Sequence, residues 1–245
     1  MRAVLALWLL GACLAANAAP LLIVTDPWAP YAYTEDGQPA GMDLEVTTQV
    51  FERMGVQVQW EFVPWRRALA MVEQGRADGV LDIFWTAARD SDLLYPGEPL
   101  SDAQFVLYQA NARPHTFSHL DDLKGLKIGV VAGYDYGTAF MQHPGFERES
   151  AATEAANFGK LLLGRLDLLV TDRRTGAYAV RRQGLQRQVS PLPGSISERP
   201  QYLALRRAPG MQALAERFSD ELRRFKREPA YTALLDRYGN LGSPQ

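Results

Sequence analysis

Residues 74–89 read Gln-Gly-Arg-Ala-Asp-Gly-Val-Leu-Asp-Ile-Phe-Trp-Thr-Ala-Ala-Arg, and they contain a helix end, a strand and a candidate binding residue. The Gln-Gly pair ends a helical pattern over residues 66–73, and residues 77–84 predict a buried strand. Thr86 and Arg89 follow the carboxyl end of that strand, where α/β sheets bind their ligands. A guanidinium there presents a rigid fork of donors that fits a carboxylate. We therefore interpret Arg89, with Thr86 beside it, as the anchor for a small acid; the alternative is a surface arginine.

The segments before this stretch follow the same alternation of strands and helices. Residues 21–24 predict a buried strand, and Asp36-Gly37 predicts a turn after a proline-rich loop. A helical stripe runs over residues 43–55, and residues 56–63 predict the next strand. Strand, helix, strand is the order that favours a parallel sheet.

A second unit of the same type follows. Residues 123–131 predict a lead-in turn and a strand, and we expect Gly133 to open the next helix. Residues 166–171 predict a buried strand that ends at Asp172, another position at a strand end. The alternative role for Asp172 is to cap the helix that follows it. Residues 202–206 predict an extended return segment. Two helical stripes, over residues 211–225 and 231–238, follow it.

Two tryptophans lie beside prolines near predicted strand ends. Trp28 and Trp65 each follow a proline directly, which favours loop placement over core packing. We interpret both as walls of a pocket that they share with Arg89. The alternative is a pair of ordinary core aromatics.

The amino-terminal residues have the features of an export signal. Met1-Arg2 is a cationic head, and residues 3–14 form an apolar run that is shorter than the roughly 20 residues of a membrane span. Ala-Asn-Ala at residues 16–18 is a cleavage pattern, so we expect a signal peptide over residues 1–18 and a periplasmic mature protein. Cys13, the only cysteine, lies within it, and lipidation at Leu10-Gly-Ala-Cys13 is the competing interpretation.

Composition and motifs narrow the function. The chain has 26 basic and 28 acidic side chains, which is too near neutral for an electrostatic nucleic-acid binder. Its 245 residues suit two lobes. The sequence has no hydrolase elbow, zinc-protease motif or phosphate loop, so we expect neither catalysis nor a cofactor. His115 and His119 have the spacing of a metal pair, but no third ligand is near, so we expect no metal site.

Six motifs, in order over almost the whole mature chain, resemble those of family 3 extracellular solute-binding proteins, the periplasmic amino-acid-binding type of ABC importers. Each motif alone is unspecific, whereas the set is specific. The motifs are Gly41-Met-Asp-Leu-Glu-Val46, Gln74-Gly-Arg-Ala-Asp-Gly79, Thr86-x-x-Arg89, Tyr95-Pro-x-x-Pro-Leu100, Asp122-Leu-Lys-Gly-Leu-Lys-Ile-Gly-Val130 and Tyr231-x-x-Leu-Leu-x-Arg-Tyr238.

The resemblance implies the α/β fold of a two-lobed, type II-like periplasmic binding protein, in which each lobe is a mixed sheet flanked by helices. It places a discontinuous first lobe at residues 19–106 and 205–245, and the second lobe at residues 107–204. Two crossovers, near residues 105–109 and 202–206, would form a hinge about which the lobes close on the ligand.

The resemblance also implies specific ligand contacts. Arg89 would hold the ligand α-carboxylate, helped by N–H groups at a helix start over residues 133–136 that includes Gly133. Asp172 would meet the α-ammonium. Trp28 and Trp65 would enclose the side chain, because an indole face stacks on apolar groups and attracts cations.

The chain departs from the family pattern within this expected pocket. Asp82, Phe84 and Trp85 stand where amino-acid binders commonly have small or hydroxyl residues, and Tyr134-Asp135 replaces a Ser-Thr pair. We include Phe84, Tyr134 and Asp135 among the expected contacts. A carboxylate at Asp135 would repel a ligand carboxylate or attract a cation, which favours a cationic or non-standard solute.

The function implied by the resemblance is capture of an amino acid or related acid by a monomer, which delivers it to an ABC permease in the inner membrane. A sensor that reports its closed form to a signalling partner is one alternative. A second is an enzyme that resembles cyclohexadienyl dehydratases on the same fold, with Asp82, Asp135 or Asp172 as the acid–base group.

Overall fold

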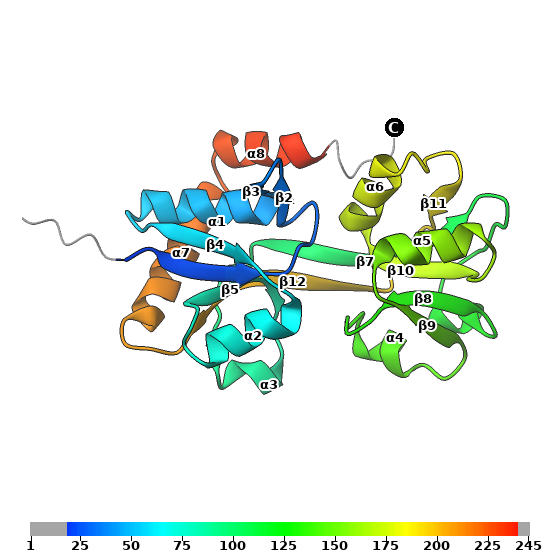
Figure 1. Cartoon of the computed structure of the whole chain (residues 1–245), viewed down its shortest axis with the longest axis horizontal. Helices are drawn as coiled ribbons and strands as arrows, with labels where there is room; N and C mark the ends of the chain where they lie inside the picture. The colour runs from blue at the N-terminus through cyan, green and yellow to red at the C-terminus, as the bar shows by residue number, and fades with distance from the viewer. Residues whose placement is uncertain (1–18, 240–245) are drawn as a thin grey trace, which may run out of the picture.

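The structure, a computed structural model, describes residues 19–239. Two α/β lobes lie side by side along the long axis of the molecule, and two long strands run between them (Figure 1). The expected two-lobed α/β fold is confirmed. The expected signal peptide, with Cys13, lies outside the described residues. Within residues 19–239, no helix combines the length and the apolar character that a membrane span requires.

The first lobe is built on three parallel strands, as the order of its segments predicts. Strands β1 (Leu21–Thr25), β4 (Val58–Phe62) and β5 (Gly79–Phe84) pair in the order β4-β1-β5. Helices α1 (Met42–Arg53) and α2 (Trp65–Glu73) connect them and cover opposite faces of the sheet. All carboxyl ends of these strands therefore point toward the second lobe (Figure 1).

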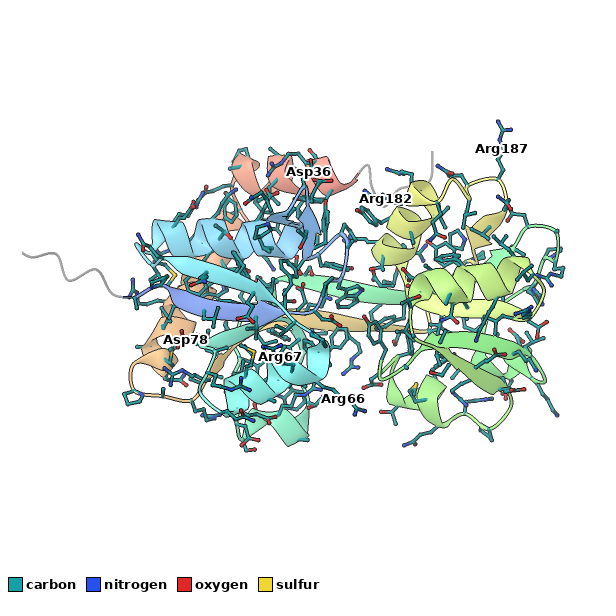
Figure 2. The ribbon with its side chains drawn as sticks, in the orientation of Figure 1. Asp36, Arg66, Arg67, Asp78, Arg182 and Arg187 are labelled. Atoms are coloured by element: carbon teal, nitrogen blue, oxygen red, sulfur yellow. The ribbon has the colours of Figure 1, made fainter. Side chains whose placement is uncertain are left out.

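A small hairpin lies beside α1. It consists of β2 (Tyr33–Glu35) and β3 (Gln38–Ala40), and its turn residues Asp36 and Gly37 have φ angles of 49° and 77°. Positive φ at both central residues is typical of the type I′ turn that suits a two-residue hairpin. The predicted turn is thus confirmed, with Asp36 at the tip of the hairpin (Figure 2).

The second lobe repeats the parallel arrangement. Strands β10, β8 and β9 pair in parallel in that order, and β11 pairs with β7. One face packs on α5 and α6, and the other on α4. The elements of this lobe are η1 (Leu120–Leu123), β8 (Lys127–Val131), α4 (Thr138–Gln142), β9 (Glu147–Ala151), α5 (Glu154–Leu162), β10 (Leu168–Asp172), α6 (Arg173–Arg182) and β11 (Val189–Pro191).

The helix expected to open at Gly133 begins later, so that prediction is wrong. Helix α4 starts at Thr138, and Gly133 and Gly137 have φ angles of 82° and 99°. A right-handed helix requires negative φ at each residue. The Asp135 side chain accepts a hydrogen bond from the Gly137 N–H at 2.9 Å, which stabilises a loop before the helix. The segment at the edge of the second lobe is therefore a loop.

Two long strands, β7 (Ser101–Ala110) and β12 (Ser197–Arg206), connect the lobes. They pair with each other over residues 101–105 and 197–201, where the chain passes between the lobes. Residues 105–109, expected as one crossover, pair with β10 in the second lobe. Residues 202–205 of the other expected crossover pair with β5 in the first. The lobe limits at 106 and 205 stay a prediction, because both strands belong to both lobes.

The end of the chain returns to the first lobe. Helices α7 (Met211–Phe225) and α8 (Pro229–Gly239) pack against α1, as the two helical stripes predict. Arg53 forms a bidentate ion pair with Glu228, with both N–O distances at 2.7 Å, and Tyr238 donates a hydrogen bond to Glu45. A short helix α3 (Ala87–Asp90) and strand β6 (Leu93–Leu94) complete this lobe.

Replacement of Gly41 by alanine is expected to destabilise the protein. Gly41 has a φ of 132°, and an added Cβ would lie 2.2 Å from the Tyr31 carbonyl oxygen. We expect Gly41→Ala to lower the free energy of unfolding by about 3 kcal/mol, measured by urea denaturation. The matched control is Gly37→Ala, which has positive φ in open space and should cost about 1 kcal/mol. Equal losses would contradict this account.

Candidate functional site

A cleft opens between the lobes beside the two connecting strands. It contains every expected contact residue except Asp172. The expected residues that line it are Trp28, Trp65, Phe84, Thr86, Arg89, Gly133, Tyr134 and Asp135, and the others are Thr25, Asp26, Asp82, Phe105 and Arg199. The first lobe supplies most of these residues from the carboxyl ends of β1 and β5. The structure thus brings together side chains that are more than one hundred residues apart in the sequence.

Arg89 lies in the wall of this cleft, and some of its N–H groups have no hydrogen-bond partner among the described residues. It occupies α3, directly after β5, and Thr86 is the residue that precedes this helix. Its Nη1 donates to the Phe84 carbonyl at 3.3 Å, and its guanidinium carbon lies 6.0 Å from the Trp65 ring centre. Within residues 19–239, no carboxylate forms an ion pair with it. The remaining N–H groups therefore suit an anionic ligand group.

Aromatic rings form the walls on both sides. Trp28 contacts Phe84 edge to face, with ring centres 6.0 Å apart, and Tyr134 of the second lobe at 6.4 Å. Phe84 in turn contacts Phe105 of β7 at 6.0 Å. Trp65 is half-buried at the first turn of α2, after Pro64. Rings placed in this way can enclose an apolar or cationic group.

The edge of the second lobe carries an ion pair that crosses to a connecting strand. Asp135 binds Arg199 of β12 at 2.8 Å, and the guanidinium of Arg199 lies 4.4 Å above the Phe84 ring. Arg199 thus neutralises the carboxylate whose charge appeared to select a cation. Because residues 133–136 form a loop, any N–H contact from Gly133 or Tyr134 would come without the dipole of a long helix.

Asp172 lies in the wall of an adjoining cavity, which shares Asp26, Trp28, Phe105 and Tyr134 with the cleft. It is 1% exposed, and it caps α6 by accepting hydrogen bonds from the N–H groups of Arg174 and Thr175. It also accepts from Tyr31 Oη at 2.9 Å and from the Gln104 N–H at 2.9 Å. The alternative role as a helix cap is confirmed. The contact with a ligand ammonium stays a prediction.

Four cleft residues had no role assigned from the sequence. Asp26 directly follows β1 as Thr86 follows β5, so its place at a strand end was a usable signal. Burial raises the pKa of Asp26. Thr25 ends β1 and shares this signal, whereas Phe105 and Arg199 lie within the connecting strands β7 and β12 and have no comparable signal.

Other polar candidates lie outside the cleft. Arg66 and Arg67 are exposed; Arg66 lies at the end of α2 nearer the second lobe and Arg67 further along the first lobe (Figure 2). Neither lines the cleft. His119 pairs with Asp122 at 3.2 Å, and His115 contacts a backbone carbonyl. The described part of the chain contains no group of three acidic, histidine or cysteine side chains that would hold a metal.

The sequence is similar to those of known solute-binding proteins. A sequence model of bacterial extracellular solute-binding proteins, family 3, matches residues 21–241. The L-cystine-binding protein TcyJ of Escherichia coli (strain K12) is 23% identical over 216 residues, which are 86% of this chain and 79% of that protein.

Solved structures share the fold at low sequence identity. AbpA from Streptococcus pneumoniae Canada MDR_19A, an amino acid ABC transporter substrate-binding protein bound to L-arginine, has a TM-score of 0.75 at 18% identity and covers 92% of this chain and 97% of its own. A histidine kinase sensor domain with similarity to periplasmic binding proteins has a TM-score of 0.74 at 21% identity, with coverages of 89% and 95%.

Loss of the Asp172 side chain is expected to destabilise the protein in the absence of any ligand. Asp172→Ala removes a cap and leaves the Tyr31 hydroxyl and Gln104 N–H without their acceptor. We expect the free energy of unfolding to fall by about 3 kcal/mol, measured by chemical denaturation. The control is Thr153→Ala, which removes the exposed cap of α5 and should cost about 1 kcal/mol. Equal effects of the two variants would argue against a structural role.

Proposed function

The chain belongs to the bacterial extracellular solute-binding proteins of family 3, and we propose that it captures a small carboxylate-bearing solute, an amino acid or a close derivative. The observation that carries this proposal is the position of Arg89. It lines the cleft between the two lobes, and no carboxylate of the described residues forms an ion pair with it. Trp28 and Trp65 enclose the rest of the solute. Thr86, Phe84 and the loop over residues 133–135 complete the contacts.

Closure of the two lobes retains the solute. Contacts between the lobes support this part of the proposal, since Tyr31 of the first lobe donates to Asp172 of the second. Ring contacts between Trp28 and Tyr134, and between Tyr33 and Tyr178 at 5.6 Å, also cross the gap. These contacts are few, polar or aromatic, and therefore compatible with reversible opening about β7 and β12.

In this proposal, the protein acts as a periplasmic monomer and delivers its solute to an ABC permease in the inner membrane. The likeness to an ABC transporter substrate-binding protein supports this role. The likeness to a histidine kinase sensor domain supports the second candidate, in which a signalling partner recognises the closed form. The two candidate functions share the same binding step. They differ only in the partner protein that recognises the closed form.

Replacement of Arg89 by alanine tests the binding step. The mature protein, unfolded and refolded to remove carried-over ligand, is heated with a panel of amino acids, polyamines and small organic acids. A solute at 100 times its Kd adds about 2.7 kcal/mol to the stability of the folded state. We expect one solute class to raise Tm and Arg89→Ala to abolish that shift, with affinity reduced by about 100-fold or more.

The control for this test is Arg66→Ala, because Arg66 is exposed and lies outside the cleft. It should leave the ligand-induced shift intact. Arg89→Ala should also leave the unliganded Tm nearly unchanged, since Arg89 makes one long hydrogen bond and no ion pair in the described structure. A large loss of unliganded stability would mark Arg89 as structural, and a panel without any shift would count against the proposed function.

A further inference from the structure

Asp82 occupies an irregular position on β5. Residues 80 and 83 pair with residues 204 and 202 of β12, so that Leu81 and Asp82 oppose Leu203 alone. Asp82 has a φ of 58°, and it and Asp36 are the only non-glycine residues between 19 and 239 with positive φ. Such a bulge redirects a side chain, and bulges of this kind are frequent beside binding sites.

The bulge brings the Asp82 side chain to the wall of the cleft. In a regular strand, Val80 and Ile83 would lie on opposite faces, but both pack in the cluster against α2. Leu81 packs on the other face, in the cluster that contains α1. Asp82 itself is 5% exposed and lines the cleft together with Arg89 and Trp28.

The carboxyl group of Asp82 has no N–H or hydroxyl donor among the described residues. The neighbour with which its oxygens interact is the carboxyl group of Asp43. Buried polar groups in folded proteins nearly always have partners, and a buried carboxylate without one is costly. Once ionised, Asp82 would therefore need donors that a ligand in the cleft can supply.

A second buried acid faces Asp82 from α1. Asp43 is 1% exposed and accepts a hydrogen bond from Ser101. Burial and the Asp43 charge together raise the pKa of Asp82 well above its usual value, and burial raises the pKa of Asp43 to about 6. A pair of this kind holds a proton at neutral pH when the cleft is empty.

The surrounding charges do not neutralise the pair. Arg199 is engaged by Asp135, and Arg89 forms no ion pair among the described residues. Arg174 and Lys226 act on Asp43 from outside the cleft. The charged groups near the pair are Arg89, Asp26, Asp135, Arg199, Arg174 and Lys226.

We propose that Asp82 binds a cationic nitrogen group of the solute, an ammonium or guanidinium, and that binding releases the proton held between Asp82 and Asp43. The inference rests on the proposed function and names the charge of its solute: an anionic group at Arg89 and a cationic group at Asp82. The Asp82 carboxylic acid gives its proton to solvent, and its carboxylate then accepts N–H donors from the ligand. Asp172 is less suited to bind this cationic group, because its oxygens already accept hydrogen bonds from at least four donors.

Matched probes that differ in one cationic group test this inference on the wild-type protein. The pairs are L-arginine with L-citrulline, L-ornithine with L-norvaline, and L-phenylalanine with L-3-phenyllactate. For the pair that fits the pocket, we expect the cationic member to bind about 100-fold more tightly. Calorimetry in two buffers of different ionisation enthalpy should show release of about one proton for each ligand bound near pH 7. The association constant should rise about tenfold per pH unit below the pKa of the pair.

The variant Asp82→Asn completes the test. It should lower the affinity for the cationic probe about 100-fold, abolish proton release and keep the unliganded Tm, because the amide, like the protonated acid, has no charge to bury. The matched control is Asp36→Asn, an exposed position with the same sign of φ at the hairpin tip (Figure 2), which should bind as the wild type does.

The outcomes separate the inference from the proposed function. If both members of the pair that fits the pocket bind equally, or if Asp82→Asn binds the cationic probe as tightly as the wild type, the inference is wrong and the proposed function stands. Proton uptake on binding would also overturn it, since Asp82 would then act as a neutral donor. If no probe in this set or in the wider panel binds, the proposed function fails, and the inference fails with it.

Discussion

The antiparallel pairing of β7 with β12 is the constraint on which the rest of the molecule depends. Residues 101–105 and 197–201 form the only described ladder between these strands; β7 also pairs antiparallel with β10 of the second lobe, and β12 with β5 of the first. This ladder turns the carboxyl ends of β1 and β5 toward the loop over residues 133–136. Without it, each lobe would have a sheet edge and half of a binding site. The hinge and the cleft are therefore consequences of the same set of hydrogen bonds.

The electrostatics of the cleft differ from what its residue types alone imply. Two arginines and three aspartates line it, yet only Arg199 and Asp135 neutralise each other. Arg89 and Asp82 lack such partners, one with free donors and the other with free acceptors. A solute with both charges would satisfy the two residues together, whereas a simple anion would leave Asp82 buried without a donor. In the proposed complex, the aromatic walls would set the shape of the solute and these two groups its charge.

Much of the architecture and of the site could be predicted from local patterns. Strand and helix periodicity located β1, α1, β4, α2 and β5, because each has a face that must be buried. Arg89, Trp28 and Trp65 were found by their positions after strands and prolines, and the structure places all three in one cleft. The start of α4 was missed, because nothing local distinguishes a glycine that opens a helix from one that requires positive φ.

The sequence by itself determined the fold class, the strand ends that carry the site and the family, since these follow from periodicity, turn chemistry and motifs. Tertiary structure alone decided the roles of the aspartates. Asp172 and Asp82 both lie in buried strands, but Asp172 meets the N–H groups of α6 and the hydroxyl group of Tyr31, and a bulge opposite Leu203 places Asp82 in the wall of the cleft. The register of one strand against another depends on residues more than one hundred positions away, and no local pattern records it.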